Sequence, residues 1–82
     1  MNKRREFALE QSRIYQLRAQ YQMTYINSGA YKEKVGKVFR GGMTSPDRRA
    51  LTEEEILKNE MAYASAHIKI AYEALEFAMG ED

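Results

Sequence analysis

The chain has no cysteine and no tryptophan, and its 82 residues include one histidine and one proline. Without cysteine, disulfides and thiolate metal sites are excluded. One histidine cannot build a zinc site alone, so we expect neither a metal nor another cofactor. No stretch approaches the roughly 20 apolar residues of a membrane-spanning helix. The sequence therefore predicts a protein that does not enter a membrane.

The first residues also lack the pattern of an export signal. Met1 is followed by the run NKRR, and no apolar run of signal-peptide length comes after it. The absence of cysteine fits a reducing compartment. We therefore expect a cytoplasmic protein.

The length of 82 residues indicates one domain, residues 1–82. A core of this size rarely contributes more than about 3–5 kcal/mol of stability without disulfides, metal or association. Because the first two are excluded or unsupported here, association is the remaining source of stability. The length alone therefore favours a homo-oligomer.

The formal net charge of +1 conceals two halves of opposite sign. Residues 1–49 contain eleven Lys and Arg against four Asp and Glu, whereas residues 50–82 contain two Lys against eight acidic residues. The two halves can neutralise each other when helices pack antiparallel. The alternative is a basic surface that meets an anionic ligand or an acidic protein.

The last third of the chain, residues 51–80, is predicted to be one long helix. Thr52 and Glu55 form a capping box at its start, and Gly80 is placed as its C-cap. An apolar seam follows it at alternating spacings of four and three residues: Leu57, Met61, Ala64, Ile68, Ala71, Leu75 and Ala78. A second stripe repeats every seven residues: Ile56, Tyr63, Ile70 and Phe77. A surface helix needs only one stripe against its own core, so the second predicts an oligomer interface.

A first helix is predicted from residue 3 to about residue 27, ended by Gly29. Its apolar side chains lie on one face at helical spacing: Phe7, Ile14, Leu17, Tyr21 and Thr24 or Tyr25. Two such helices joined by a compact middle give an antiparallel hairpin. We therefore expect an all-α fold in which the hairpins assemble into a homo-oligomeric helical bundle.

Residues 30–50 are the least regular part of the chain. The spacing of four apolar residues indicates a short helix: Tyr31, Val35, Val38 and Phe39. Gly36 weakens this helix by about 1 kcal/mol. A strand is the alternative, but it would have no partner in the chain, and a lone strand is not stable. Gly41 and Gly42 end the segment, and Ser45-Pro46 is either a helix start or a simple turn.

The same middle segment concentrates basic residues beside aromatic and small ones. Arginine can bind phosphate bidentately, tyrosine can stack on a base, and glycine lets a backbone N–H approach closely. These ingredients suit a nucleotide phosphate. The candidate ligand-binding residues are Tyr31, Lys32, Lys34, Lys37, Arg40, Thr44, Arg48 and Arg49. The alternative is a solvated basic loop that joins two helices.

Catalysis has little support, because no nucleophile can be placed near the single histidine. We expect His67 to be a packed or interface residue. The run of three glutamates at 53–55 is explained by helix capping and the helix dipole. Glu60, Glu73 and Glu76 are interpreted as a solvated face. We therefore expect no catalytic residue and no enzyme activity.

Residues 64–75, ASAHIKIAYEAL, resemble the last helix of small phage proteins that antagonise cyclic-oligonucleotide (CBASS) immunity. The shared pattern is histidine, an aliphatic residue, a small residue followed by an aromatic, and then Ala-Leu. The chain differs from that family in the acidic run at 51–56, which leads directly into the last helix here. The resemblance implies a short, helical, oligomeric and non-catalytic sponge for cyclic nucleotides in the host cytoplasm, and it assigns no ligand residue.

Two functions are consistent with these features. The first is a non-enzymatic oligomer that sequesters or occludes an anionic, nucleotide-type ligand, with a direct nucleic-acid binder as a variant. The second is a small protein–protein inhibitor or adaptor that docks its apolar second stripe on a larger protein. An enzyme would need a polar pocket built across subunits.

Overall fold

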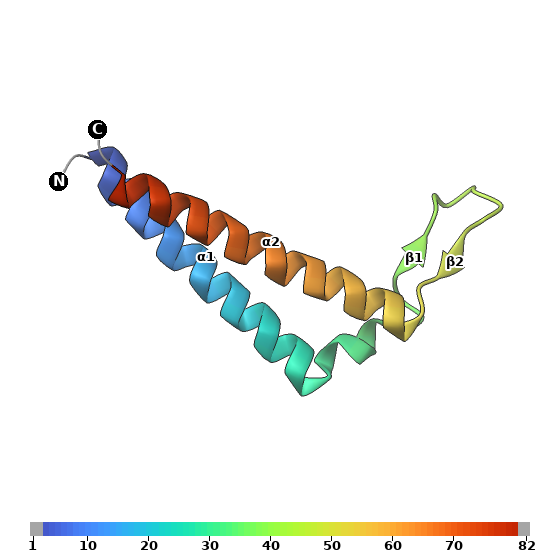
Figure 1. Ribbon diagram of the computed structural model, residues 1–82. Helices are drawn as coiled ribbons and strands as arrows, with labels where there is room; N and C mark the ends of the chain where they lie inside the picture. Colours follow the sequence, from blue (N-terminus) through green and yellow to red (C-terminus); the bar gives the residue numbers. More distant parts are fainter. Residues whose placement is uncertain (1–2, 81–82) are drawn as a thin grey trace.

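The computed structural model describes residues 3–80, which form a helical hairpin with a small two-stranded sheet at one end (Figure 1). The elements in chain order are α1 (Lys3–Ser28), the 3-10 helix η1 (Ala30–Lys34), β1 (Phe39–Arg40), β2 (Arg49–Ala50) and α2 (Glu53–Met79). The start of α1 lies beside the end of α2, and the molecule is elongated, with extents of 53 × 29 × 14 Å. The prediction of two long helices forming a hairpin is confirmed.

Local sequence signals set the helix ends. The Thr52 hydroxyl accepts a hydrogen bond from the Glu55 amide at 3.2 Å, and the Glu55 carboxylate accepts one from the Thr52 amide at 3.1 Å. These two bonds confirm the predicted capping box. α1 ends before Gly29, whose φ of 78° lies in the left-handed region that glycine adopts without strain. Gly80 is the C-cap of α2, as predicted, but its backbone is extended.

Small side chains fill the contact between the two long helices. The buried residues of α1 are Ala8, Ser12 and Ala19, and those that face them along α2 include Ala64, Ala71 and Ala78. The predicted apolar face of α1 is therefore wrong: Phe7, Leu17 and Tyr21 are exposed. Small side chains let two helix backbones approach closely, and that close approach leaves no room for large side chains between them.

The predicted seam of α2 is right in its alanines and wrong in two of its larger residues. Met61 and Ile68 are exposed, while Glu60, expected on a solvated face, is buried at 5% exposure. His67 is half-buried, with its ring centroid 5.8 Å from that of Tyr15, as expected for a packed histidine. The helix is rotated so that its alanines, rather than its largest apolar residues, meet α1.

This rotation places large apolar side chains on two opposite faces of the hairpin. Ile68 and Leu75 lie beside Met23 on one face, and Phe77 lies beside Phe7 on the other. Consecutive helical residues point about 100° apart, so Ile68 and Ile70, two residues apart, point about 200° apart. The alanines of the predicted seam thus form the interhelical contact, and the larger exposed side chains of the two stripes flank it.

The middle segment contains two paired strands, which corrects the expectation that a strand would have no partner. Phe39 lies opposite Ala50 and Arg40 opposite Arg49 in antiparallel register, and the Leu51 amide donates to the Val38 carbonyl at 2.8 Å. The partner comes from the residues just before α2. The expected short helix is limited to η1, because Gly36, with φ of 81°, turns the chain out of it.

Candidate functional site

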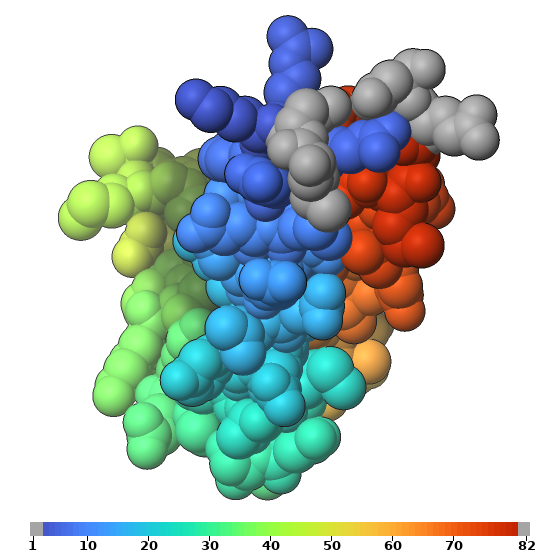
Figure 2. Space-filling view, turned by 90° about the vertical axis from the view of Figure 1, so that its left-hand side faces the viewer, coloured from blue at the N-terminus to red at the C-terminus, as the bar shows by residue number. Residues whose placement is uncertain are grey.

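The β1–β2 connection is a basic loop that projects beyond the outline of the helices (Figures 1 and 2). Gly41, with φ of 88°, turns the chain after β1, and the Arg48 amide donates to the Ser45 carbonyl at 3.2 Å to close a turn. Pro46 therefore belongs to a simple turn and not to a helix start. The resulting hollow is lined by Arg40, Gly41, Ser45, Pro46, Asp47, Arg48 and Arg49.

Three arginines, Arg40, Arg48 and Arg49, line this hollow, which we call the basic loop site. Arg40 and Arg49 face each other across the strand pair, and the Arg48 guanidinium lies 4.4 Å from the centre of the Phe39 ring. Such stacking holds an arginine side chain while leaving its N–H groups available. Within residues 3–80, Asp47 is the single carboxylate in the lining. The arrangement can bind an anion bidentately.

Arg49 also connects the basic loop site to the start of α2. Its two terminal nitrogens donate to the two carboxylate oxygens of Glu55 at 2.7 and 2.9 Å. The hydrogen bonds from Arg49, followed by the one from the Thr52 amide, lower the pKa of Glu55 from 4.5 to about 2. The same carboxylate raises the pKa of Arg49. This pair fixes the loop on the capped end of the helix.

The Glu55 pair predicts a specific acid dependence of stability. The pKa of Glu55 is lower in the folded than in the unfolded protein. Its contribution to folding stability is therefore complete above pH 4.5 and is lost as the pH falls through about 2. Glu55→Gln keeps an acceptor for the capping box but removes the charge. We expect the wild type to lose more stability than Glu55→Gln between pH 5 and about pH 2 in urea unfolding series. Equal losses in the two proteins would contradict this role of Glu55.

The structure separates the other predicted ligand residues from the basic loop site. Tyr31 is buried, so its ring offers no face to a base. The Lys32 ammonium nitrogen lies 3.7 Å from a carboxylate oxygen of Glu53, with which it forms an ion pair. Lys37 and Thr44 are exposed and lie outside the lining of the hollow. Of the eight predicted residues, the fold therefore brings together Arg40, Arg48 and Arg49.

Lys34, the remaining predicted ligand residue, belongs to a second cluster around the buried Glu60. Its ammonium group donates to the Glu60 carboxylate and lies 5.3 Å from the centre of the Tyr25 ring. The amide of Gln22 donates to the other carboxylate oxygen. The hydrogen bond to Glu60 raises the pKa of Lys34. The cluster joins η1 to both long helices, and so it positions the segment that carries the loop.

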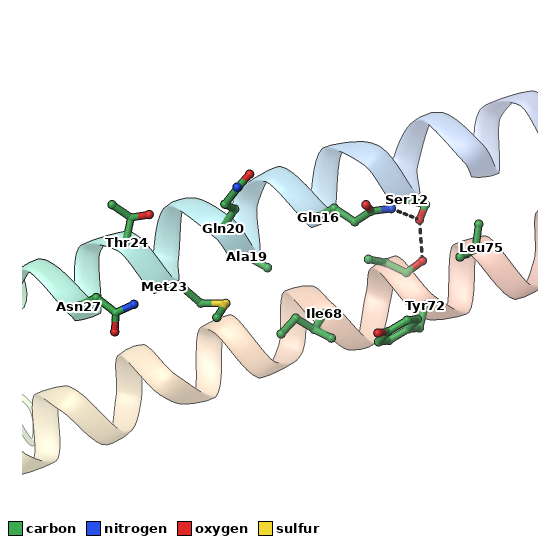
Figure 3. Close-up of a pocket in the computed structure, with 11 residues that line it drawn as sticks. Ser12, Gln16, Ala19, Gln20, Met23, Thr24, Asn27, Ile68, Tyr72 and Leu75 are labelled. Carbon is green, nitrogen blue, oxygen red and sulfur yellow. Dashed lines mark hydrogen bonds between the residues drawn. The ribbon is translucent and has the colours of Figure 1, made fainter.

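An open groove runs along one face of the hairpin, between α1 and α2 (Figure 3). Its floor includes Ser12, whose hydroxyl donates to the Ala71 carbonyl at 2.8 Å and accepts from the Gln16 amide at 3.1 Å. The alanines Ala19, Ala64 and Ala71 line it, and its larger apolar residues are Met23, Ile26, Met61, Ile68, Tyr72 and Leu75. Its polar lining residues are Ser12, Gln16, Gln20, Thr24, Asn27 and Ser65. None of the lining residues, within residues 3–80, is charged.

Sequence reasoning missed this uncharged groove, although two signals for it were present. Residues 19–31 contain no charged residue in a chain of which 30% is charged. Small residues also recur in α1 at positions 8, 12 and 19, at spacings of four and seven. The large apolar side chains of α1 give the stronger periodic signal, although the small residues beside them mark the face that packs.

The predicted oligomer stripe lies on the opposite face. Ile56 is buried, at 2% exposure, where η1 contacts α2 through Lys32 and Lys34. Tyr63, Ile70 and Phe77 are exposed, and Phe77 lines a shallow hollow with Phe7 and the basic residues Lys3 and Arg4. We call Tyr63, Ile70 and Phe77 the exposed stripe. Ile56, the fourth residue of the predicted stripe, is buried within the hairpin and is not part of the exposed stripe.

These features define a two-helix hairpin that carries a basic two-stranded loop. Across residues 3–80, neither long helix combines the length and apolar character that a membrane crossing requires. The same residues contain no group of three or more His, Cys, Asp or Glu side chains placed to hold a metal ion. Comparison of the chain with protein-family models, curated proteins and solved structures finds no match.

Proposed function

We propose that the protein is a non-enzymatic, self-associating binding protein whose basic loop site sequesters or occludes an anionic, nucleotide-type ligand. The observation that carries the proposal is that Arg40, Arg48 and Arg49 all line one projecting hollow, with Arg40 and Arg49 opposite each other in the strand pair. Arg40 has no ion-pair partner within residues 3–80, and Arg48 is held on an aromatic ring. An anion can therefore be bound by arginines that are already positioned.

The charge pattern and the sequence resemblance support the same proposal. The basic loop belongs to the half of the chain with the excess of Lys and Arg, and it stands apart from the acidic α2 except at the Arg49–Glu55 pair. Residues 64–75 resemble the last helix of phage antagonists of cyclic-oligonucleotide immunity. A phage-encoded antagonist of host defence, acting in the host cytoplasm, is the specific form of this proposal.

Calorimetric titration with cyclic dinucleotides and trinucleotides tests the basic loop site. The variant Arg40→Ala/Arg48→Ala removes two guanidinium groups from it. Because each charge-assisted hydrogen bond contributes about 1.5 kcal/mol, we expect Kd to rise about 100-fold. The variant Arg13→Ala/Lys69→Ala removes the same charge from exposed helix positions and should bind like the wild type. If the wild type releases no heat with any of these ligands at micromolar concentrations, the nucleotide proposal fails.

The exposed stripe favours a second candidate function, a small protein–protein inhibitor or adaptor. Tyr63 and Phe77 are each about 60% exposed, which is unusual for aromatic residues that repeat on one helix face. Aromatic residues are enriched in the centres of protein interfaces. A target protein that docks there would bind the hairpin without using the basic loop site, so the two functions are separable by substitution.

A further inference from the structure

The uncharged groove differs in its chemistry from the basic loop site, from the hollow beside Phe77 and from the one beside Lys34 and Glu60, all of which have charged residues in their lining. Its larger apolar residues are two methionines, two isoleucines, a leucine and a tyrosine, and its borders carry amides and hydroxyls instead of charges. Depletion of charge together with Met and Tyr is the composition of a protein interface core. Because 30% of the residues in the chain are charged, this absence marks the groove as a surface that is not simply solvated.

The border chemistry indicates which partner fits. Gln16, Gln20 and Asn27 each carry a donor and an acceptor on one side chain, as do the hydroxyls of Thr24 and Ser65. Such groups can pair with a copy of themselves across a two-fold axis. Lys, Arg, Asp and Glu cannot, because each is only a donor or only an acceptor and repels its own copy. A neutral amide border is therefore self-complementary, as an isologous interface requires.

The exposed stripe on the opposite face is less suited to the same contact. Lys3 and Arg4 border the hollow that Phe77 shares with Phe7, and the middle segment covers the Ile56 end. The groove has neither obstacle from Ser12 to Asn27, a length of about 22 Å along α1. Figure 3 shows Met23 pointing from α1 toward α2, with Ile68 beside it and Gln20 and Thr24 turned away from α2.

We propose that a second copy of the chain docks on the uncharged groove, so that two hairpins form a four-helix bundle with Met23, Ile68 and Leu75 at its centre. This inference rests on the self-association in the proposed function and assigns it to one face. Docking there leaves the exposed stripe and the basic loop site accessible in the dimer. The stripe is then available for a different protein and the loop for an anion.

Two of the isoleucines of α2, Ile68 and Ile70, provide a matched test. Ile68 in the groove is 37% exposed and Ile70 on the exposed stripe is 39% exposed, so glutamate at either position has a similar effect on the isolated hairpin. We expect the wild type to scatter light as a dimer, at twice the chain mass of 9.5 kDa. Ile68→Glu should raise the dimer dissociation constant about 100-fold or more, because two charges lose water in one symmetric interface, while Ile70→Glu stays dimeric.

Gln20→Glu provides a second measurement, which leaves the apolar residues of the groove unchanged. Gln20 is exposed at the groove border, so its substitution leaves the hairpin intact, which the helical circular dichroism signal verifies. Gln20→Glu should also weaken the dimer, because it places a negative charge at the groove border of both copies. A wild type at 9.5 kDa would refute self-association itself, whereas a dimer that Ile70→Glu dissociates and Ile68→Glu and Gln20→Glu leave intact would refute only the assignment to the groove.

Discussion

Replacing Ala71 by leucine is expected to remove about 3 kcal/mol of stability, enough to unfold a large part of the protein. Ala71 is buried at the contact between the helices, and its carbonyl accepts the hydrogen bond from the Ser12 hydroxyl. Because Ala71 is only 5% exposed at this contact, a leucine side chain there would press on α1 and push the helices apart. Separation also leaves the Ser12 hydroxyl without its partner. Urea unfolding followed by circular dichroism, at one protein concentration, measures the loss.

Ala62→Leu is the control for this substitution. Ala62 is exposed on the same helix, so Ala62→Leu adds the same side chain without placing it in the contact between the helices. The expected change is within about 0.5 kcal/mol. If the two variants unfolded at the same urea concentration, the close approach of the helices through small side chains would be disproved.

Lys34→Met is expected to destabilise the protein by about 2 kcal/mol. The substitution leaves the Glu60 carboxylate buried with only the Gln22 amide as a partner. Breaking a fully buried ion pair costs about 3–5 kcal/mol, and the value here is smaller because the Lys34 side chain is 44% exposed to water. The β1–β2 loop should also lose order, since η1 is no longer held on the helices. Thermal unfolding and amide hydrogen exchange in residues 30–50 measure these two effects.

Lys32→Met is a close control, because Lys32 is in the same 3-10 helix and its pair with Glu53 is exposed. Exposed pairs contribute about 0–1 kcal/mol, so little change is expected. The double variant Lys34→Met/Glu60→Leu should recover most of the lost stability, since it removes both charges of the buried pair. A double variant as unstable as Lys34→Met would show that the charge of Glu60 is not the cause.

Local chemistry in the sequence was sufficient to place both long helices. The reciprocal bonds of Thr52 and Glu55 and the left-handed Gly29 depend on residues close in the chain, and their effect does not depend on the rest of the fold. The strand pair was missed because Phe39 and Arg40 find their partners eleven and nine residues later, across a loop whose geometry depends on Gly41 and the Ser45 turn. Pairing of two short segments is a tertiary property.

For the candidate sites, too, the sequence predicted which residues are charged, and the tertiary structure determined which of them lie together. The sequence placed Arg40, Arg48 and Arg49 in one basic segment, and the strand register then brought them to one hollow. It also grouped Lys34 with them, but the fold directs that side chain toward Glu60. Charge content can be counted along a chain, whereas the partner of each charge depends on which elements pack together.

The sequence by itself determined the two helices, their capped ends, the opposite charges of the two halves and the presence of two apolar stripes on α2. Only the tertiary structure decided how α2 is rotated about its axis against α1. The physical reason is that apolar periodicity identifies which residues share a stripe, but not which stripe is packed. Here the alanines permit a close backbone approach, so they form the contact, and the larger side chains of both stripes are left wholly or partly exposed, except for the buried Ile56.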